Sequence, residues 1–423
     1  MGRLAVAAGV CGRGLGADPH PAGREEGMSA SAGLRPVSLL LISFSYPPVL
    51  GGSEIEAQRV SAALMRRGHR VKVLCAGLPA MPGVADWVDP AGVPVRIFAH
   101  GWNTPYLDCL FALGVAWTLL KERRQYGLVY FLMSGLHLAT GLPVARLLGK
   151  PIVMKVSGSS IITTMRGSFL GRLELRWLKK WARRVMILNS SMAGEAAAAG
   201  FEARQLLWMP NPVDTTDFAP CQPAERDRLR ALLSIPSLQP VVVYVGRLAP
   251  EKELGSLIGA FSAVVRKIPG ALLVLVGDGP CRDELQARAQ RLGLNDSVRF
   301  AGRQTVGEVR QWLQAADVFT LVSSSEGFPC SLVEAMSTGL PSVVSGISAN
   351  TQLIDPGVHG LHAAMGDETS IAGALIHLLG DEALRASMGR AARQRVLDNY
   401  SMDKVADRYE ALFLEALEGV IRT

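Results

Sequence analysis

The stretch Ser323–Thr338 reads SSSEGFPCSLVEAMST and joins an apolar segment, Val318–Val322, to a helical pattern. We expect a buried strand, a short polar loop and then a helix, an order typical of α/β proteins. The loop leaves unpaired N–H groups at the start of the helix, which favours a bound anion such as a phosphate. Glu326 lies in the loop and Glu334 is expected in the first helical turn, so both carboxylates could accept hydrogen bonds from sugar hydroxyls.

The same residues also allow a purely structural interpretation. Ser331 and Glu334 fit the S-x-x-E pattern of a capping box, and Glu326 could be a solvated loop acid. This stretch alone leaves both interpretations open.

Length and composition indicate a globular protein with two domains. The chain has 423 residues, more than one hydrophobic core usually holds, and 49% of them are hydrophobic. The 44 basic and 37 acidic residues give a net charge of +7, which suits an anionic ligand or membrane surface but is too small to indicate nucleic acid. The six cysteines are scattered without a C-x-x-C pair, so we expect no zinc site, no disulfide framework and a cytoplasmic location.

Two stretches bear on targeting and on membranes. Residues 1–34 are rich in Ala, Gly and Arg, so we expect a disordered extension outside the fold, with Met28 as an alternative start. The apolar run Leu110–Leu120 covers only about half a membrane span and ends in charged residues, which predicts a core helix.

The first half of the chain begins like a doubly wound α/β domain. A strand at Val37–Phe44 is followed by a turn with Gly51 and Gly52, a helix to Arg67 and a strand at Val71–Leu74. The two glycines would let a ligand approach the backbone, or they form a flexible connection.

Two further strands, at Leu128–Leu132 and Ile152–Val156, end at the same expected sheet edge. The first leads to His137, which is either a sugar contact or a core histidine, and the second leads to Ser157. A helix expected at Phe169–Val185 would carry basic residues on one face and tryptophans on another. It could lie on an anionic membrane or be an ordinary solvated helix.

The pattern restarts in the second half. A strand at Val241–Val245 opens into Gly246 and Arg247, and Lys252 precedes an amphipathic helix. The two cations could face one phosphate, although surface cations flank many helices. Further strands and helices follow, and Thr305 with Glu308 forms a second capping-box pattern.

Together these features suit a nucleoside diphosphate bearing a sugar. Arg247 and Lys252 would neutralise the diphosphate, so no metal is required, and no D-x-D pair or His/acid cluster with metal-ligand spacing is found. A dehydrogenase is less well supported, because no G-x-G-x-x-G follows either domain's first strand.

At this point the chain resembles a known family over about residues 36–420. It looks like a family-four retaining glycosyltransferase with the GT-B fold. The matching motifs are GGSE at 51–54, GRLAPEKE at 246–253, VGDGP at 276–280, E-x7-E in EGFPCSLVEAM at 326–336, GLP at 339–341, NPVD at 211–214 and GVHGL at 357–361.

The resemblance implies two Rossmann-like domains facing a cleft, with the last helix crossing back to the first domain. We place a disordered extension at 1–34, an acceptor-side domain at 35–215, a nucleotide-sugar domain at 216–400 and the crossover helix at 401–423.

The resemblance also implies roles for individual residues. Arg247 and Lys252 would hold the donor diphosphate, Glu326 would lie against the donor sugar and Glu334 would bind the ribose. The catalytic residues implied are therefore Glu326, Arg247 and Lys252. The expected donor-binding residues are Gly51, Gly52, Gly246, Arg247, Lys252, Glu326, Gly327, Phe328, Pro329, Ser331, Leu332 and Glu334.

The sequence departs from the family at three places. Ser157 stands where many members have a histidine that contacts the donor sugar, so Ser157 and His137 are weaker candidates for that contact. The usual K-G is Lys252-Glu253, and the usual N-G-V-D is Asn211-Pro212-Val213-Asp214.

We therefore expect a retaining, metal-independent enzyme that moves a sugar from a nucleotide diphosphate sugar to a hydroxyl of a sugar or lipid-linked acceptor. We expect it to act in polysaccharide or glycolipid biosynthesis, in the cytoplasm or at the cytoplasmic face of a membrane. The alternative is an inactive nucleotide-sugar-binding subunit of a glycan assembly complex, which Ser157 would favour.

Overall fold

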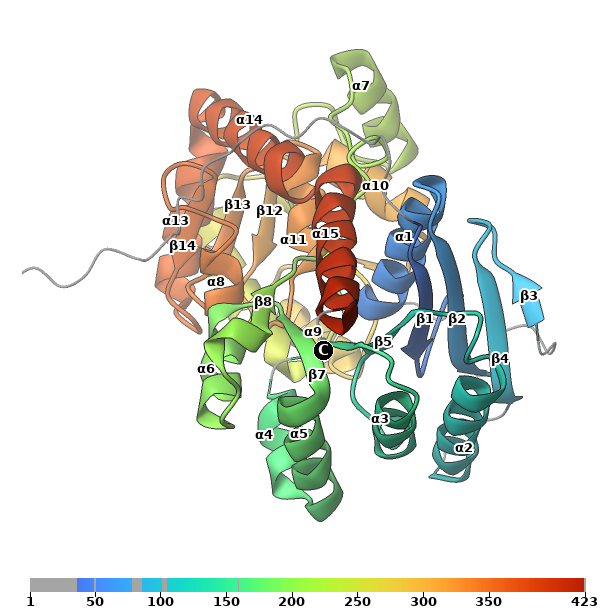
Figure 1. Cartoon of the computed structure of the whole chain (residues 1–423). Coiled ribbons are helices and arrows are strands. Elements are labelled where there is room, and N and C mark those ends of the chain that lie inside the picture. The colour runs from blue at the N-terminus through green and yellow to red at the C-terminus, as the bar shows by residue number, and fades with distance from the viewer. Residues whose placement is uncertain (1–35, 49–50, 78–85, 101–104, 159, 422–423) are drawn as a thin grey trace, which may run out of the picture. The chain divides into compact units, whose positions relative to one another are not determined.

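The computed structural model describes residues 36–48, 51–77, 86–100, 105–158 and 160–421. The expected extension at 1–34 lies outside these residues. The described chain forms two sheets of mainly parallel strands, each covered by helices (Figure 1). The predicted α/β class with two Rossmann-like domains is confirmed.

The first sheet has eight strands in the order β3-β4-β2-β1-β5-β6-β7-β8. Its strands are β1 (Ser38–Ser43), β2 (Arg70–Gly77), β3 (Asp86–Val88), β4 (Pro94–His100), β5 (Leu128–Leu132), β6 (Ile152–Lys155), β7 (Ala182–Ile187) and β8 (Leu206–Trp208). Only the β3–β4 pair is antiparallel. The central strands are buried on both faces, which explains why they appear as continuous apolar runs in the sequence.

Helices cover both faces of this sheet. They are α1 (Gly52–Arg66), α2 (Pro105–Lys121), α3 (His137–Leu147), α4 (Ile161–Gly167), α5 (Phe169–Trp181) and α6 (Ser190–Ala198). α1 packs with the C-terminal helix α15 (Met402–Ile421) on one face, and α2, α3, α4, α5 and α6 pack on the other.

The second sheet has six parallel strands in the order β11-β10-β9-β12-β13-β14. Its strands are β9 (Val241–Val245), β10 (Leu272–Val276), β11 (Val298–Gly302), β12 (Val318–Leu321), β13 (Ser342–Ser345) and β14 (Gly360–Ala363). The helices of this half are α7 (Pro223–Leu232), α8 (Leu254–Lys267), α9 (Arg282–Arg291), α10 (Val306–Ala315), α11 (Cys330–Ser337), α12 (Ser348–Thr351), α13 (Glu368–Gly380) and α14 (Glu382–Asn399). Thr305 caps α10 in the predicted capping box with Glu308.

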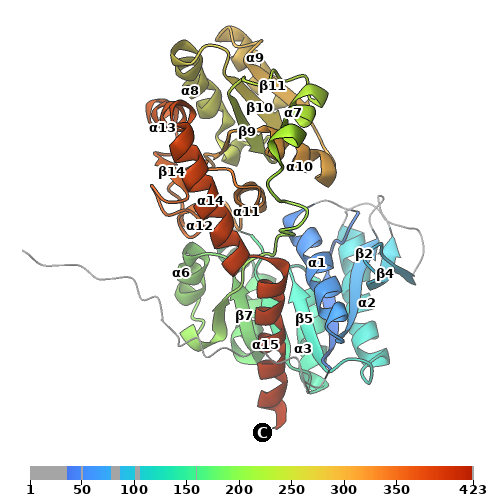
Figure 2. The same ribbon diagram turned by 90° about the horizontal axis from the view of Figure 1, so that it is seen from above.

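The last helix returns to the first sheet, as expected. Figure 2 shows α14 leading into α15, which lies beside α1 and β5. Arg67, just after α1, bonds Asp407 at 2.7 Å and Glu410 at 3.0 Å on α15. This long helix therefore completes the core of the first domain with residues from the end of the chain.

The helix expected at Phe169–Val185 is shorter than predicted. α5 ends at Trp181, and Ala182 begins strand β7, which pairs in parallel with β6. The helical periodicity continues into Arg183, but pairing with the neighbouring strand overrides this local preference. Arg183 therefore lies on a strand and not on the basic helix face.

Strands β3, β4, β8 and β14 were not predicted, because they are short or carry polar residues. Among the described residues, no helix is long and apolar enough to cross a membrane.

Candidate functional site

The loops after β9 and β12 meet because these two strands are neighbours in the second sheet. The Lys252 ammonium lies 2.7 Å from Glu326 Oε1, and Ser323 Oγ donates to the same oxygen at 2.7 Å. Both partners are mostly buried, with Lys252 16% and Glu326 10% exposed. The structure therefore brings together two of the three residues predicted to be catalytic.

Arg247 follows the same strand but has a different partner. Its guanidinium bonds Glu251 at 2.8 Å and is largely exposed. Burial alone would raise the pKa of the Glu251 carboxyl. A backbone hydrogen bond and the neighbouring Arg247 outweigh burial and hold this pKa below its usual value. Arg247 and Lys252 thus lie on one loop and pair with different carboxylates.

The residue after Lys252 has an unusual backbone conformation. Glu253 is at the N-cap of α8 with φ 53° and ψ 32°, in the left-handed region that favours glycine. This is one of the three positions at which the sequence departs from the family pattern. The glycine expected there would adopt this conformation without strain.

Helix α11 begins at Cys330, so Glu334 is its fifth residue and lies in the second turn. The prediction of a first-turn position was wrong, because the loop residue Pro329 is already the N-cap. Ser331 is inside the helix, and no side chain caps it, so the capping-box interpretation of Ser331 and Glu334 is also wrong.

The carboxylate of Glu334 is held by a residue from the first domain. Arg59 on α1 lies 3.7 Å from Glu334 Oε1 and also donates to the carbonyl of Pro212. Burial raises the pKa of Glu334 to about 7, although Arg59 acts in the opposite direction. Arg59 was not among the predicted site residues.

The glycine turn of the first domain contacts this region. A Cβ at Gly52 would lie 3.3 Å from Cys330 Sγ, at the start of α11. At Gly51 the space of a Cβ is filled by the Glu54 carboxylate, which accepts a hydrogen bond from Ser45. The turn is therefore compact, and a side chain at position 51 would have to displace the Glu54 carboxylate.

Asn189, in the first domain, binds the loop of the second domain that carries Glu326. This contact was not predicted from the sequence. Asn189 Nδ2 donates to the carbonyl oxygens of Gly327 at 2.8 Å and Glu326 at 3.3 Å. Its Oδ1 accepts from the Met192 amide at 2.9 Å and caps α6. The pattern Asn189-Ser190-Ser191 predicts a helix start, but nothing local identifies the partner 138 residues away.

A buried charge network lies behind Cys330. Lys155 is fully buried and donates to Glu56, to Asn211 Oδ1 at 2.8 Å and to Tyr409 at 3.1 Å. Burial lowers the pKa of Lys155, and Glu56 opposes this shift. Asn211 Nδ2 reaches Cys330 Sγ at 3.5 Å, so this network connects α1, β6 and α15 to the start of α11.

Three other predicted donor-binding residues lie where they pack against the protein interior. Phe328 packs against the cores of both domains, and Leu332 is fully buried. Gly246 leaves no room for a side chain, because its Cβ would lie 2.6 Å from the Tyr244 hydroxyl.

His137 and Ser157, the weaker candidates for a sugar contact, are enclosed. His137 is 1% exposed between the rings of Phe111 and Phe131, and burial lowers its pKa to about 4. The core-histidine interpretation therefore describes its position. Ser157 Oγ is also buried and has no partner among the described residues.

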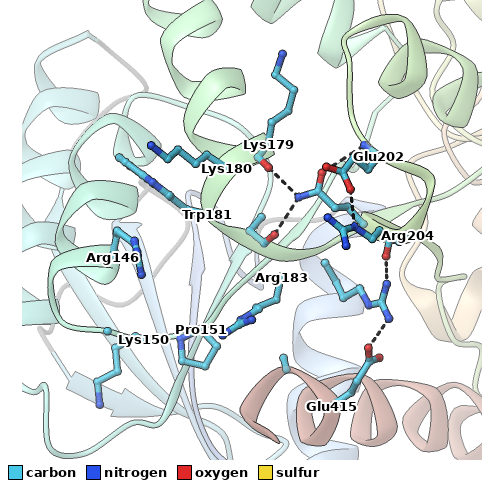
Figure 3. Close-up of a pocket in the computed structure, with 15 residues that line it drawn as sticks. Arg146, Lys150, Pro151, Lys179, Lys180, Trp181, Arg183, Glu202, Arg204 and Glu415 are labelled. Atoms are coloured by element: carbon cyan, nitrogen blue, oxygen red, sulfur yellow. Dashed lines mark hydrogen bonds and ion pairs between the residues drawn. The ribbon is translucent and has the colours of Figure 1, made fainter. Parts of the chain in front are cut away.

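A hollow lies at the amino-terminal edge of the first sheet, away from the loops that carry Lys252 and Glu326 (Figure 3). Its volume is about 830 Å³, and Lys179, Lys180 and Arg183 from the predicted basic helix line it together with Arg146 and Lys150. Arg184 and Arg204, also in the lining, pair with Glu415 and Glu202. Three of the five predicted basic residues thus line this hollow, whereas Arg172 and Arg176 are exposed on α5 outside it.

No group of three or more His, Cys, Asp or Glu side chains that could hold a metal ion occurs in the part of the chain that the structure describes. The five cysteines in that part are free thiols.

Comparisons with known proteins cover most of the chain. The model of Glycosyltransferase Family 4 matches residues 50–217, and that of Glycosyl transferases group 1 matches residues 225–395. An N-acetyl-alpha-D-glucosaminyl L-malate synthase of Bacillus anthracis is 24% identical over 383 residues, which are 89% of this chain and 97% of that protein.

Two further similarities add to this. A UDP-Gal:alpha-D-GlcNAc-diphosphoundecaprenol alpha-1,3-galactosyltransferase of Escherichia coli is 28% identical over 70% of this chain and 77% of that protein. The crystal structure of Anabaena HepE in complex with UDP and glucose has a TM-score of 0.73, with 21% identity over 89% of this chain and 99% of that chain, and it shows the same fold.

Proposed function

The chain belongs to the group 1 glycosyltransferases of the GT-B type, and we propose that it moves a sugar from a nucleotide diphosphate sugar to a hydroxyl group with retention of anomeric configuration and without a metal ion. Its relatives include glycosyltransferases named for lipopolysaccharide core biosynthesis and for a phosphatidylinositol monomannoside. The acceptor we propose is a sugar or a lipid-linked sugar, as in the name of the Escherichia coli relative.

One observation carries this proposal. Lys252 and Glu326 come from different loops, yet they meet at 2.7 Å where two neighbouring parallel strands end. In α/β folds this edge is where ligands bind. Lys252 would exchange Glu326 for the diphosphate, which would leave the Glu326 carboxylate free to face the donor sugar.

The departing diphosphate is the group that needs stabilisation. Lys252 and Arg247 would supply positive charge as the bond to the sugar breaks, which is the largest protein contribution we expect. Glu334, already among polar partners at the domain contact, would bind the ribose in place of Arg59. Gly51 and Gly52 would lie against the diphosphate from the first domain.

A thermal-shift panel of UDP-, GDP- and ADP-sugars tests donor binding, because a ligand that binds the folded state raises the melting temperature. One donor should raise it in the wild type and much less in Lys252→Ala. Proton NMR of the first product formed would show whether the anomeric configuration is retained, and transfer should survive EDTA. If no nucleotide sugar shifts the melting temperature, the proposal fails.

The alternative is a nucleotide-sugar-binding subunit without activity. Ser157 favours it, because its buried hydroxyl replaces a histidine that titrates near neutral pH. Slow hydrolysis of the bound nucleotide sugar by purified protein would decide for the enzyme. Binding without hydrolysis or transfer would decide for the subunit.

A further inference from the structure

The outward face of helix α2 is apolar along its whole length. Tyr106, Leu113, Trp117 and Leu120 are 72%, 63%, 46% and 44% exposed. Their spacing of seven, four and three residues puts them on one side of the helix. Because a surface helix normally turns polar residues to water, this face is suited to an apolar environment.

The opposite face of α2 is fixed in the core, so the helix cannot rotate to bury these side chains. Phe111, Val115 and Leu119 are fully buried. Gly114 is so close to β4 that a Cβ would lie 2.0 Å from the Phe98 ring. The outward apolar face is thus a constant feature of the folded domain.

Exposed basic residues lie at the end of α2 and on the helices of the same layer. α2, α3 and α5 lie side by side on one face of the first sheet (Figure 1). The exposed basic residues on these helices, or just after α2, are Lys121, Arg123, Arg124, Arg146, Arg172, Arg176 and Lys180.

The same helices carry few exposed acids. Glu122, just after α2, is buried and pairs with Lys72 and Arg96, and Glu174 on α5 is also buried. Asp108 is the one other acid on α2, α3 or α5, and it is half-buried. The outer surface of this layer is therefore both apolar and strongly basic.

The end of the apolar stripe combines an aromatic ring with a cation. Lys121 Nζ lies 4.2 Å from the centre of the Trp117 ring, and that ring packs on Phe98. Tryptophan favours the boundary between lipid headgroups and acyl chains, and a neighbouring lysine can reach the phosphates. Arg123 and Arg124 follow at the same end of the helix.

We propose that α2 docks on an anionic lipid bilayer, with Leu113, Trp117 and Leu120 in its outer apolar layer and Lys121, Arg123 and Arg124 on phosphate groups. Charge complementarity selects a bilayer over a second copy of the chain, because two copies would bring two basic surfaces together. The docking element is α2, where the sequence had indicated the helix at Phe169–Val185. The proposal does not depend on the transfer reaction.

Co-sedimentation of the full chain with vesicles tests it. The wild type should bind mixed phosphatidylcholine–phosphatidylglycerol vesicles at low salt and bind pure phosphatidylcholine vesicles weakly. The variant Leu113→Ser/Trp117→Ser/Leu120→Ser should lose affinity about tenfold or more. Leu232→Ser/Leu238→Ser, which removes two exposed leucines of the other domain, is the matched control and should bind like the wild type.

A second pair of variants tests the charges. Arg123→Gln/Arg124→Gln should lose affinity about tenfold at low salt, whereas Arg266→Gln/Lys267→Gln, an exposed basic pair at the end of α8, should not. Circular dichroism melting would confirm that each variant is folded.

Three results would overturn the proposal. The wild type could fail to bind the mixed vesicles, or the triple variant on α2 could bind them as well as the wild type. Light scattering could also show a wild-type dimer that the triple variant converts to a monomer, which would assign the face to a second copy.

Discussion

Replacing Asn189 by aspartate would test whether the contact between the domains positions the loop of Glu326. Aspartate has the same shape, and its oxygen can still accept from the Met192 amide, so the cap of α6 is kept. What is lost is the donor group that binds the carbonyls of Gly327 and Glu326 at 2.8 and 3.3 Å.

The expected magnitude follows from these contacts. Asn189 is 2% exposed, so the carbonyls lose a hydrogen bond without gaining water, and a carboxylate oxygen faces them instead. Leaving buried polar groups unpaired costs about 1–3 kcal/mol, and the charge adds to this. If the loop must be held for transfer, kcat/KM should fall by about tenfold or more, since 1.4 kcal/mol is a factor of ten.

The variant should also acquire a pH dependence. A buried carboxyl group beside two carbonyl oxygens has a pKa above the usual value of about 3.9. Its protonated form can donate a hydrogen bond to a carbonyl, so the defect of Asn189→Asp should shrink as pH falls and grow as pH rises. Asn189→Ala has no such proton and should show a defect that is constant with pH relative to the wild type.

Steady-state assays of donor kcat/KM from mildly acidic to mildly alkaline pH would measure this. Asn295→Asp adds the same charge at an exposed loop and serves as the control. If Asn189→Asp stays within twofold of the wild type at every pH, the contact between Asn189 and the loop has no role in transfer.

Three further predictions concern single side chains. Lys252→Ala should lower transfer by at least about a hundredfold at saturating donor, because the diphosphate loses a cation. The midpoint of urea unfolding should fall only modestly, since Glu326 keeps its hydrogen bond from Ser323. Undiminished turnover would contradict the proposed role of Lys252. Glu253→Gly should raise the free energy of unfolding by about 0.5–1 kcal/mol, because glycine relieves the left-handed strain; a lower urea midpoint would argue against it. Burial raises the pKa of Glu174 to about 7, so its neutral form stabilises the fold fully below about 4.5 and this contribution is lost as pH rises through about 7. Above pH 7, the free energy of unfolding of Glu174→Gln should therefore exceed that of the wild type by up to about 3 kcal/mol, seen as a higher urea midpoint. At pH 4 the two proteins should have the same urea midpoint.

The sequence determined the strands of the sheet centres and the loops that follow them. Val241–Val245, Leu272–Val276 and Leu128–Leu132 begin and end as predicted. A strand buried on both faces must be apolar at every position, and this pattern is visible locally. Loops at the ends of neighbouring parallel strands then share one edge, which is why the approach of Lys252 to Glu326 could be expected.

The tertiary structure decided which distant side chains meet. Arg59, Asn189 and Lys155 were not predicted, because their partners lie on other elements and no local pattern specifies a partner. The end of α5 was wrong for the same reason, since pairing with β6 and not local periodicity determines where strand β7 begins.

The outward face of α2 gives the clearest division between the two. The sequence Leu110–Leu120 is almost uniformly apolar and predicts a core helix, which is confirmed for one face of α2 and wrong for the outward face. Which side chains remain exposed cannot be read from a uniform pattern. Phe111 and Gly114 pack toward the first sheet, and this packing turns Leu113 and Trp117 outward. A helix can place only one of its faces against a sheet.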